Sequence, residues 1–474
     1  MKKRILFVRT HKTLNAGGPV PPLGILYIAS AVMGAYKDAY EIKICHFEVK
    51  GFSINDLKDE TASFSPQIVG ISAMTCEFDL AQATARIVKE HCKETVVIIG
   101  GPHASLAKER ILENRDFDFV VIGEGERTFV DLLNAVDKKN DLARVNGICY
   151  RSGSGIHINL AQPYIEDLDN YSVSSAAWGL IDLKEYSCCL SWNGINKEKL
   201  YAPVVTSRGC PFQCSFCRSR AVFGKVFRAR SPENVFNEIA DLYNNHRVRE
   251  IHIFDDVFNF DADRVKEICR SIIKSGLKIG LAFPNGLRAD LMSEDLIRLL
   301  RQAGAYKINY GIETVNAHCQ TSTRKELDIK RTEGIINMTA SAGIIASGYF
   351  IMGLPDETIE DMRRTVDFAI RSNLHNAYFF KFADFSRSET GLIANNELHF
   401  HYIKDKASKE SKMDAEINKL IFEAQQGFYL NFNRILRLFL RTNQKIGFLK
   451  NVAFSFALML RVYLERELGQ VSKK

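Results

Sequence analysis

Residues 204–217 read VVTSRGCPFQCSFC and place Cys210, Cys214 and Cys217 in the spacing C-x3-C-x2-C. A glycine before the first cysteine and a proline after it predict a turn, because neither residue favours a continuing helix or strand. Three thiolates on one tight loop can bind three irons of a cubane cluster, whereas ferredoxin-type sequences supply a fourth cysteine in the same run. The sequence therefore predicts a [4Fe–4S] cluster with one open iron, and an open ligand position is typical of metal sites that do chemistry.

Other uses of these cysteines fit the sequence less well. A zinc site usually has two C-x2-C pairs or one pair with two histidines. The other close pair, Cys188 and Cys189, consists of adjacent residues. A disulfide framework is not expected in a chain of this size without a secretory signal. Three unrelated buried cysteines would have no need of turn residues between them, so we expect cluster binding.

The whole chain has the composition of a globular protein of two or three domains. Its 474 residues are 46% hydrophobic and 25% charged, and no apolar run is long enough for a signal peptide or a membrane span. Eleven cysteines without a signal peptide predict a reducing cytoplasm. The net charge of +7 comes without a nucleic-acid-binding motif, so no nucleic-acid partner is expected. That charge is compatible with an acidic substrate or a membrane surface.

Residues 1–140 alternate short apolar runs with helical stretches. The runs are rich in Val and Ile, as expected of parallel strands buried on both faces, and they cover residues 5–8, 42–47, 68–73, 95–100 and 119–123. Between them, segments such as residues 80–88 space their apolar residues as an amphipathic helix does. The pattern predicts a doubly wound, Rossmann-like α/β domain, which would bind a ligand at the carboxyl ends of its strands.

Small and polar residues follow three of these strands. They are Ser72 and Thr75 after the third strand, Gly100, Gly101 and His103 after the fourth, and Gly123, Glu124 and Gly125 after the fifth. Glycines at strand ends let the backbone approach a large flat ligand closely. The G-x-G-x-x-G of a dinucleotide site is absent after the first strand. Each glycine cluster alone fits an ordinary turn equally well, but their occurrence at successive strand ends predicts a binding site.

A second series of strands and helices occupies residues 199–385, after a linker at 141–198 that contains a hairpin turn at 151–155. The expected strands cover residues 250–254, 279–283, 305–310, 348–352 and 378–382, and residues 262–274 are expected to form a helix. Repeating units of this length predict a partial, TIM-like (β/α)6 barrel with its active site at the strand carboxyl ends. The cysteine loop follows the first of these strands, as that rule requires.

The strand ends of the barrel offer polar groups around the open iron. Asp255 and Asp256 end the second strand, and a carboxylate there can meet an ammonium group. Glu313 ends the fourth strand, where it can accept hydrogen bonds from ribose hydroxyls. Gly353 ends the fifth strand and begins the sequence GLPDET, a close-approach turn suited to an adenine edge. For each residue, a helix cap or a surface ion pair is the alternative.

The last region, residues 386–474, departs from the barrel pattern and predicts helices. Residues 426–441 combine apolar side chains with Arg434, Arg437 and Arg441. A basic amphipathic helix can lie on a membrane surface. It can equally pack against the barrel and cover it, and this is the arrangement that we expect. Peripheral membrane contact through these helices stays an alternative.

Two parts of the chain resemble known domains. The cysteine loop, with Phe216 before its third cysteine, resembles the signature of radical S-adenosylmethionine enzymes, and residues 1–140 resemble a cobalamin-binding domain. Together they resemble the cobalamin-dependent radical S-adenosylmethionine family, which includes radical C-methylases and the anaerobic magnesium-protoporphyrin monomethyl ester cyclase. The D-x-H-x-x-G motif of many other cobalamin proteins is absent, so His103 is expected near the corrin edge and not on the cobalt.

The resemblance implies the roles of the candidate residues. Cys210, Cys214 and Cys217 would bind the cluster, and the small and polar residues at the first domain's strand ends would bind cobalamin. Asp255 or Asp256 would replace the family's usual Gly-Gly-Glu at S-adenosylmethionine, and Glu313 and Gly353 would contact the same cofactor.

The resemblance also implies an enzyme acting on a small molecule, with an external one-electron reductant of the flavodoxin or ferredoxin type. It implies C-methylation of an unactivated carbon through a 5′-deoxyadenosyl radical and methylcobalamin. Ring formation of the porphyrin-cyclase type is the enzymatic alternative, and a non-catalytic cobalamin sensor or carrier is the alternative of another class. Methylthiolation of transfer RNA is disfavoured because Cys45, Cys76 and Cys92 lie on different elements.

Overall fold

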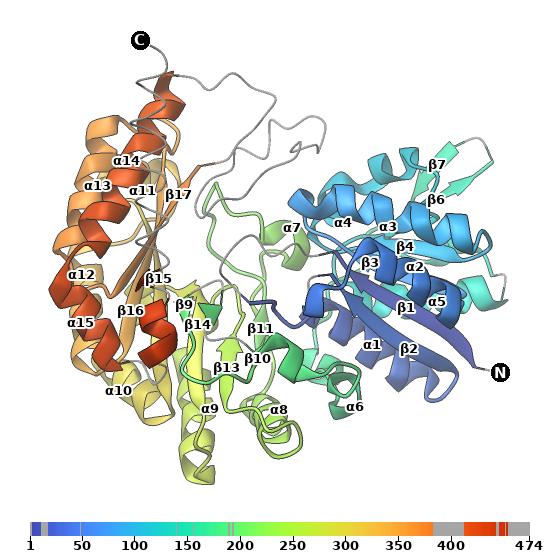
Figure 1. Ribbon diagram of the computed structural model, residues 1–474, viewed down its shortest axis with the longest axis horizontal. Helices are drawn as coiled ribbons and strands as arrows, with labels where there is room; N and C mark the ends of the chain where they lie inside the picture. The colour runs from blue at the N-terminus through green and yellow to red at the C-terminus, as the bar shows by residue number, and fades with distance from the viewer. Residues whose placement is uncertain are drawn as a thin grey trace.

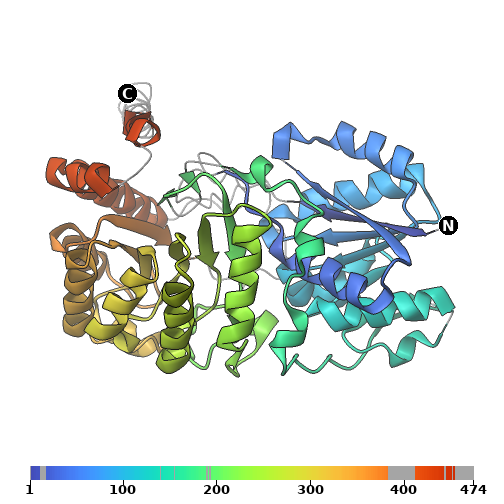
Figure 2. The same cartoon turned by 90° about the horizontal axis from the view of Figure 1, so that it is seen from below.

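A computed structural model shows two α/β units side by side, each built around its own parallel sheet (Figures 1 and 2). It describes residues 2–10, 18–47, 49–138, 140–153, 155–187, 190–191, 194–382, 412–441, 445–450 and 452–453. The first sheet has the strand order β2-β1-β3-β4-β5-β6-β7, and the second has the order β10-β13-β14-β15-β16-β17. The expected fold class is confirmed.

The first unit is the doubly wound domain expected from the apolar runs. Its parallel strands are β1 (Lys3–Arg9), β2 (Tyr40–His46), β3 (Ile68–Ser72), β4 (Val96–Gly100) and β5 (Phe119–Val121). Its main helices are α1 (Leu23–Tyr36), α2 (Ile54–Phe64), α3 (Phe78–His91), α4 (Pro102–Ala107) and α5 (Gly125–Lys138).

Strand β1 shows why these runs are apolar throughout. Ile5 and Phe7 pack with α1 and α5 on one face of the sheet, whereas Leu6 and Val8 pack with α2 and α3 on the other. A strand buried on both faces has no solvent side on which to place polar residues.

The first sheet continues beyond the expected boundary at residue 140. Strand β6 (Ile148–Ser152) pairs antiparallel with β5, and β7 (Gly155–Ile158) pairs antiparallel with β6. The predicted hairpin turn is therefore confirmed, and the hairpin extends this sheet instead of lying free between two domains.

The second unit is a six-stranded parallel barrel of the predicted kind. Its strands are β10 (Tyr201–Val204), β13 (Glu250–Ile253), β14 (Gly280–Leu287), β15 (Ala305–Glu313), β16 (Ile345–Met352) and β17 (Asn376–Lys381). The helices that follow the strands are α8 (Pro232–Asn244), α9 (Ala262–Ser275), α10 (Glu294–Gln302), α11 (Ala317–Ser322), α12 (Ile329–Ser341) and α13 (Ile359–Arg371). Every neighbouring pair of strands is parallel, so all six carboxyl ends open on one face.

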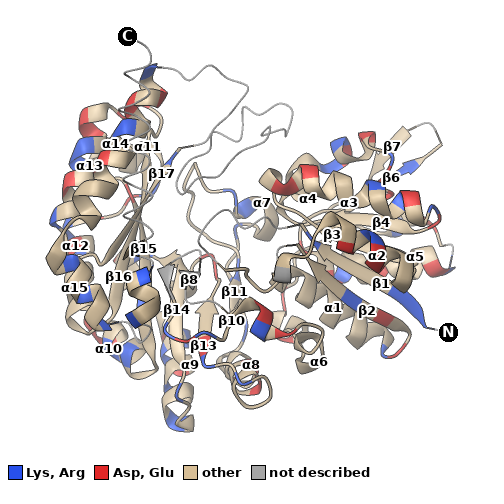
Figure 3. Cartoon of the chain, viewed as in Figure 1, with Lys and Arg blue, Asp and Glu red and all other residues tan. Residues whose placement is uncertain are grey.

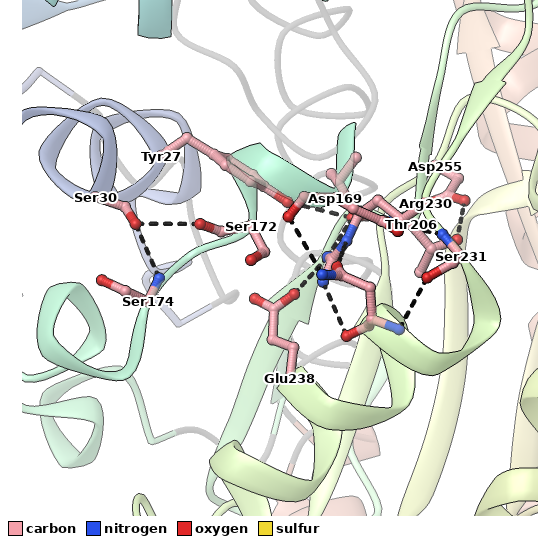
Figure 4. A network of polar contacts seen from close by, with 12 residues as sticks. Tyr27, Ser30, Asp169, Ser172, Ser174, Thr206, Arg230, Ser231, Glu238 and Asp255 are labelled. Atoms are coloured by element: carbon pink, nitrogen blue, oxygen red, sulfur yellow. Dashed lines mark hydrogen bonds and ion pairs between the residues drawn. The ribbon is translucent and has the colours of Figure 1, made fainter. Parts of the chain in front are cut away.

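The segment between the units fills the space between them (Figure 4). The Ser30 hydroxyl of α1 donates to the Ser172 carbonyl at 3.1 Å and accepts from the Ser174 amide at 3.0 Å. On the other side, Asp169 accepts from the Ser231 amide at 2.8 Å, directly before α8. These bonds tie the segment to both units and restrict their relative movement.

Helices α14 (Lys412–Tyr429) and α15 (Phe432–Arg441) cover the barrel, as expected. Arg434 is 2% exposed, and its guanidinium donates to the Leu374 and Phe428 carbonyls at 3.1 and 2.7 Å. Leu438 packs in an apolar cluster with residues at the amino ends of strands β15 and β16. Among the described helices, none is long and apolar enough to cross a bilayer. Residues 404–411 and 454–464 lie outside the described part of the chain.

Candidate functional site

The cysteine loop leaves the carboxyl end of β10 and is closed at its base. Strand β11 (Ser207–Arg208) pairs antiparallel with β12 (Arg228–Ala229), so the chain returns to its starting point after the three cysteines. Gly209 has φ +81°, and a Cβ on this residue would lie 2.2 Å from the Val226 carbonyl oxygen. Only glycine fits there, because the left-handed backbone and the close approach both exclude a side chain.

The three cysteines are free and partly exposed. Burial raises the pKa of the Cys210 and Cys214 thiols, and for Cys214 the nearby cations Lys325 and Arg288 oppose that rise. Bound iron would supply the positive charge that thiolates need in this partly buried position. In the described part of the chain, no three His, Cys, Asp or Glu side chains form a site for one metal ion. Three thiolates that each bind a different iron of a cubane do not need to converge on one point.

The two acidic residues after β13 have different environments. Asp255 is 2% exposed and accepts three bonds, from the Thr206 amide (2.6 Å), the Thr206 hydroxyl (2.5 Å) and the Ser207 hydroxyl (2.6 Å). It anchors the start of the cysteine loop (Figure 4). Asp256 lies close enough to Cys210 for its charge to raise the pKa of that thiol. Burial raises the pKa of the Asp256 carboxyl group, and the Ser219 side chain and the Gly209 backbone oppose this rise. Its Oδ2 is buried, and no described residue donates a well-placed hydrogen bond to it, so a donor on a ligand would satisfy this atom.

Glu313 ends β15 beside Cys214 in a strained conformation. Its φ is +67°, which is unusual for a residue with a side chain and is typical of functional sites. Burial raises the pKa of its carboxyl group, and Lys325 opposes this from 3.3 Å. Arg288 donates to the Lys325 carbonyl at 3.1 Å and stacks over Phe212 in the cysteine loop at 3.7 Å. Sequence reasoning missed Lys325, because it does not lie in a pattern that assigns a cation to this site.

The turn that begins at Gly353 is fixed by a residue that sequence reasoning also missed. Gly353 has φ +82°, and its amide donates to Glu357 Oε2 at 2.8 Å. The other carboxylate oxygen of Glu357 accepts from the Thr314 hydroxyl at 3.0 Å. Glu357 thus connects the ends of β15 and β16. GLPDET contains the signal for this bond, since its glutamate lies four residues after its glycine.

The glycines at the strand ends of the first unit let backbone segments approach each other. Gly100 is the last residue of β4, and Gly101 has φ +94°, with its Cβ position 3.1 Å from Ser72 Oγ. Gly123 has φ +75°, and a Cβ on Gly125 would lie 3.0 Å from Ile28 Cδ1. At Gly101 and Gly125, atoms of the same unit occupy the place of a Cβ, so these glycines allow close packing at the strand ends.

His103 packs into the first unit as a neutral side chain. It is 2% exposed, its Nδ1 lies 3.3 Å from Thr75 Oγ1, and its ring lies 4.2 Å from the Phe78 ring. Burial lowers its pKa to about 4, so the imidazole is uncharged near neutral pH. Thr75 and His103, predicted together as ligand-binding residues, thus contact each other.

The Glu124 carboxylate faces the second unit. It accepts from Arg208 at 3.1 Å, from Arg228 at 3.0 Å and from the Ile165 amide at 2.8 Å. Glu126 accepts from the same Arg208 at 2.5 Å. The two arginines occupy both carboxylate oxygens of Glu124. We therefore expect any contact of this residue with cobalamin to come from its backbone. We call Arg208, Arg228, Glu124 and Glu126 the interface ion-pair network.

Comparison with known proteins assigns both units. Residues 204–369 match the radical SAM superfamily, and residues 12–133 match the B12 binding domain family. A protein of Pyrococcus horikoshii named uncharacterized methyltransferase PH0819 is 28% identical over 86% of this chain and 88% of its own. The anaerobic magnesium-protoporphyrin IX monomethyl ester cyclase of Rubrivivax gelatinosus is 29% identical over 77% of this chain and 65% of its own.

A solved structure shares the fold. The radical S-adenosylmethionine methyltransferase TsrM of Kitasatospora setae, with cobalamin and a [4Fe–4S] cluster bound, matches with a TM-score of 0.66 at 19% identity, over 80% of this chain and 75% of that one. The chain therefore contains a radical S-adenosylmethionine domain and a B12-binding domain. Its cofactors are a [4Fe–4S] cluster, S-adenosylmethionine and cobalamin, and it is an enzyme, not a non-catalytic cobalamin carrier.

Proposed function

We propose that this enzyme transfers a methyl group to an unactivated carbon of a small molecule. The observation that carries the proposal is the contact between the cysteine loop and the strand ends of the B12-binding domain. Arg208, two residues before Cys210, bonds to Glu124 and Glu126 directly after β5. Helix α7 (Arg220–Phe223), which follows Cys217, contacts α4, which follows the glycines after β4. A substrate between the two sites would be within reach of both cofactors.

The residues present fit the three cofactors. When bound, the cluster and S-adenosylmethionine supply a 5′-deoxyadenosyl radical, and methylcobalamin supplies the methyl group. The cysteine loop would hold the cluster, and the backbone around residues 72–75, 100–103 and 123–125 would hold cobalamin. The open oxygen of Asp256 would accept from the amino group of S-adenosylmethionine. Arg288 or Lys325 would pair with its carboxylate, Glu313 with its ribose, and the Gly353 turn with its adenine.

Exchanging each aspartate for asparagine should separate their roles. We expect Asp256→Asn to weaken S-adenosylmethionine binding roughly tenfold or more, since a hydrogen bond to a charged group contributes about 1.5–3 kcal/mol. Asp255→Asn should instead lower the unfolding temperature, because its three donors would meet an amide that accepts at only one atom. Equilibrium titration of the iron-loaded variants and thermal denaturation measure the two effects. Equal loss of binding in both variants would contradict this assignment.

Product mass distinguishes methylation from the second candidate, oxidative ring formation. The relatedness to the porphyrin cyclase of Rubrivivax gelatinosus favours that alternative. With S-adenosylmethionine labelled in its methyl group, we expect a product heavier by one labelled methylene, together with 5′-deoxyadenosine. A product that has lost hydrogen or gained oxygen, without the label, would support the cyclase reaction instead. Mass spectrometry of complete reactions against a candidate substrate panel makes this measurement.

A small-molecule substrate agrees with the methyltransferase relatives, and the radical chemistry calls for an external one-electron reductant. One face of α15 exposes Phe432, Leu436 and Leu440. An exposed apolar face of this kind supports peripheral contact with a membrane. A cytoplasmic location and the absence of a nucleic-acid partner stay predictions from the sequence.

A further inference from the structure

A pocket of about 520 Å³ lies against the cysteine loop. Cys214 and Cys217 line it, but the strand-end groups Asp256, Arg288 and Glu313 do not. Most of its lining residues are exposed, and Arg324 points into it while the next residue, Lys325, is buried toward Glu313. The pocket therefore opens to solvent on the outer side of the loop, away from the proposed S-adenosylmethionine site.

All the described charged residues that line this pocket are cations. Its charged lining residues are Arg218, Arg220, Lys225 and Arg324, and no Asp or Glu is among the residues that line it. Figure 3 shows this positive charge on α7 and on the loop that leads into it. Val226, next to Lys225, is an apolar residue that is 69% exposed. Four cations thus line the same pocket as Cys214 and Cys217, with the exposed Val226 next to one of them in the chain.

We propose that this basic surface, formed by Arg218, Arg220, Lys225 and Arg324, docks a small acidic one-electron carrier protein. The inference rests on the proposed function, because only a redox cluster on this loop gives an electron carrier a reason to bind here. Complementary charge raises the rate of encounter and orients the carrier. In the step itself the carrier loses one electron and the oxidised cluster gains it, and no bond forms or breaks. Such encounters need only a small interface with a polar rim.

Charge reversal of the three exposed cations tests the proposal. The test variant is Arg218→Glu/Lys225→Glu/Arg324→Glu, and the probe is reduced flavodoxin mixed with iron-loaded protein without S-adenosylmethionine or substrate. The rate of cluster reduction is followed by stopped-flow absorbance and by the EPR signal of the reduced cluster. We expect the rate at low ionic strength to fall tenfold or more, and its decrease with added salt to disappear.

Two controls make the result specific to the basic surface. Reversal of exposed cations elsewhere, in Lys93→Glu/Lys138→Glu/Lys274→Glu, should leave the rate close to that of wild type. Reduced methyl viologen, a small cationic reductant, should reduce the test variant at least as fast as the wild type, which shows that its cluster is intact. The neutral variant Arg218→Gln/Lys225→Gln/Arg324→Gln should give an intermediate rate with flavodoxin.

Equal rates with flavodoxin in wild type and test variant would overturn the proposal. A loss of rate that is the same in the test variant and in the distant control would also overturn it, because net charge alone would then explain the effect. Normal cluster reduction by flavodoxin without any methylated product would count against the proposed function and leave the docking surface supported.

Discussion

Replacing Cys210, Cys214 and Cys217 together with alanine is expected to remove the iron and all activity while leaving cobalamin bound. Anaerobically prepared wild-type protein should contain about four irons and about one cobalt per chain, and the variant should keep only the cobalt. The physical reason is that the cysteine loop would carry the cluster ligands, whereas the strand ends that we propose to face cobalamin belong to a separate sheet. Iron and cobalt analysis and the visible spectrum measure both cofactors.

The fold should survive this change. The three cysteines are partly exposed, so alanine leaves no closed cavity in the core. The loop base also stays paired through β11 and β12. Cys92→Ala/Cys269→Ala is the matched control, since these cysteines lie on the first unit and on α9, away from the loop. Iron retained in the triple variant, or lost equally in the control, would contradict a cluster on this loop.

Removing Glu124 is expected to have the largest effect on stability among single substitutions at the interface. Glu124→Ala would leave Arg208 and Arg228 buried without their shared carboxylate. Breaking a buried ion pair from one side costs about 3–5 kcal/mol. We therefore expect a lower unfolding temperature and faster proteolysis in residues 159–187, where the segment between the units would become accessible.

An exposed ion pair provides the comparison. Glu294→Ala removes one of the two acidic partners of Arg298 on the surface of α10, and such changes usually stay within about 0.5 kcal/mol. Glu124→Gln keeps the shape of the side chain and should lie between the two variants in stability. Because Arg208 is two residues from Cys210, Glu124→Gln should also change the EPR signal of the reduced cluster. A Glu124→Ala protein as stable as the Glu294→Ala protein would show that the network does not join the units.

The sequence predicted the elements because its strands are buried on both faces and its helices on one. The strands of the first unit could be recognised from runs such as Ile68–Ser72, where Ile68 packs on one face of the sheet and Val69 and Ile71 pack on the other. Helix α9 was predicted to within one residue because Val265, Ile268 and Ile272 recur with the period of a helix. That the hairpin after residue 140 joins the first sheet could not be predicted, because a short hairpin has the same sequence pattern in a sheet and in a linker.

The candidate site was predictable where it depends on residues close together in sequence. The cysteine spacing, the glycines at strand ends and the acidic pair after β13 are local patterns. The cysteine spacing indicates a cluster by itself, whereas the glycines and the acidic pair indicate a site through their positions at strand ends. The sequence did not show whether Asp255 or Asp256 faces the cofactor site, because adjacent residues at a strand end point to opposite sides. Asp255 accepts from the buried Thr206, whereas Asp256 lies near Cys210.

The sequence by itself thus predicted the two folds and the three-cysteine cluster loop, because periodicity and ligand spacing are properties of single segments. Its resemblance to a known family implied S-adenosylmethionine and cobalamin. Only the tertiary structure decided which polar groups are already satisfied. Glu124 lies 84 residues from Arg208, and Glu313 lies beside Cys214 only because β10 and β15 belong to one barrel. In the sequence, Glu124 and Glu313 look the same, because each is a carboxylate at or after the end of a strand. Whether it meets an arginine of the other unit or the space for a cofactor depends on how the units pack together.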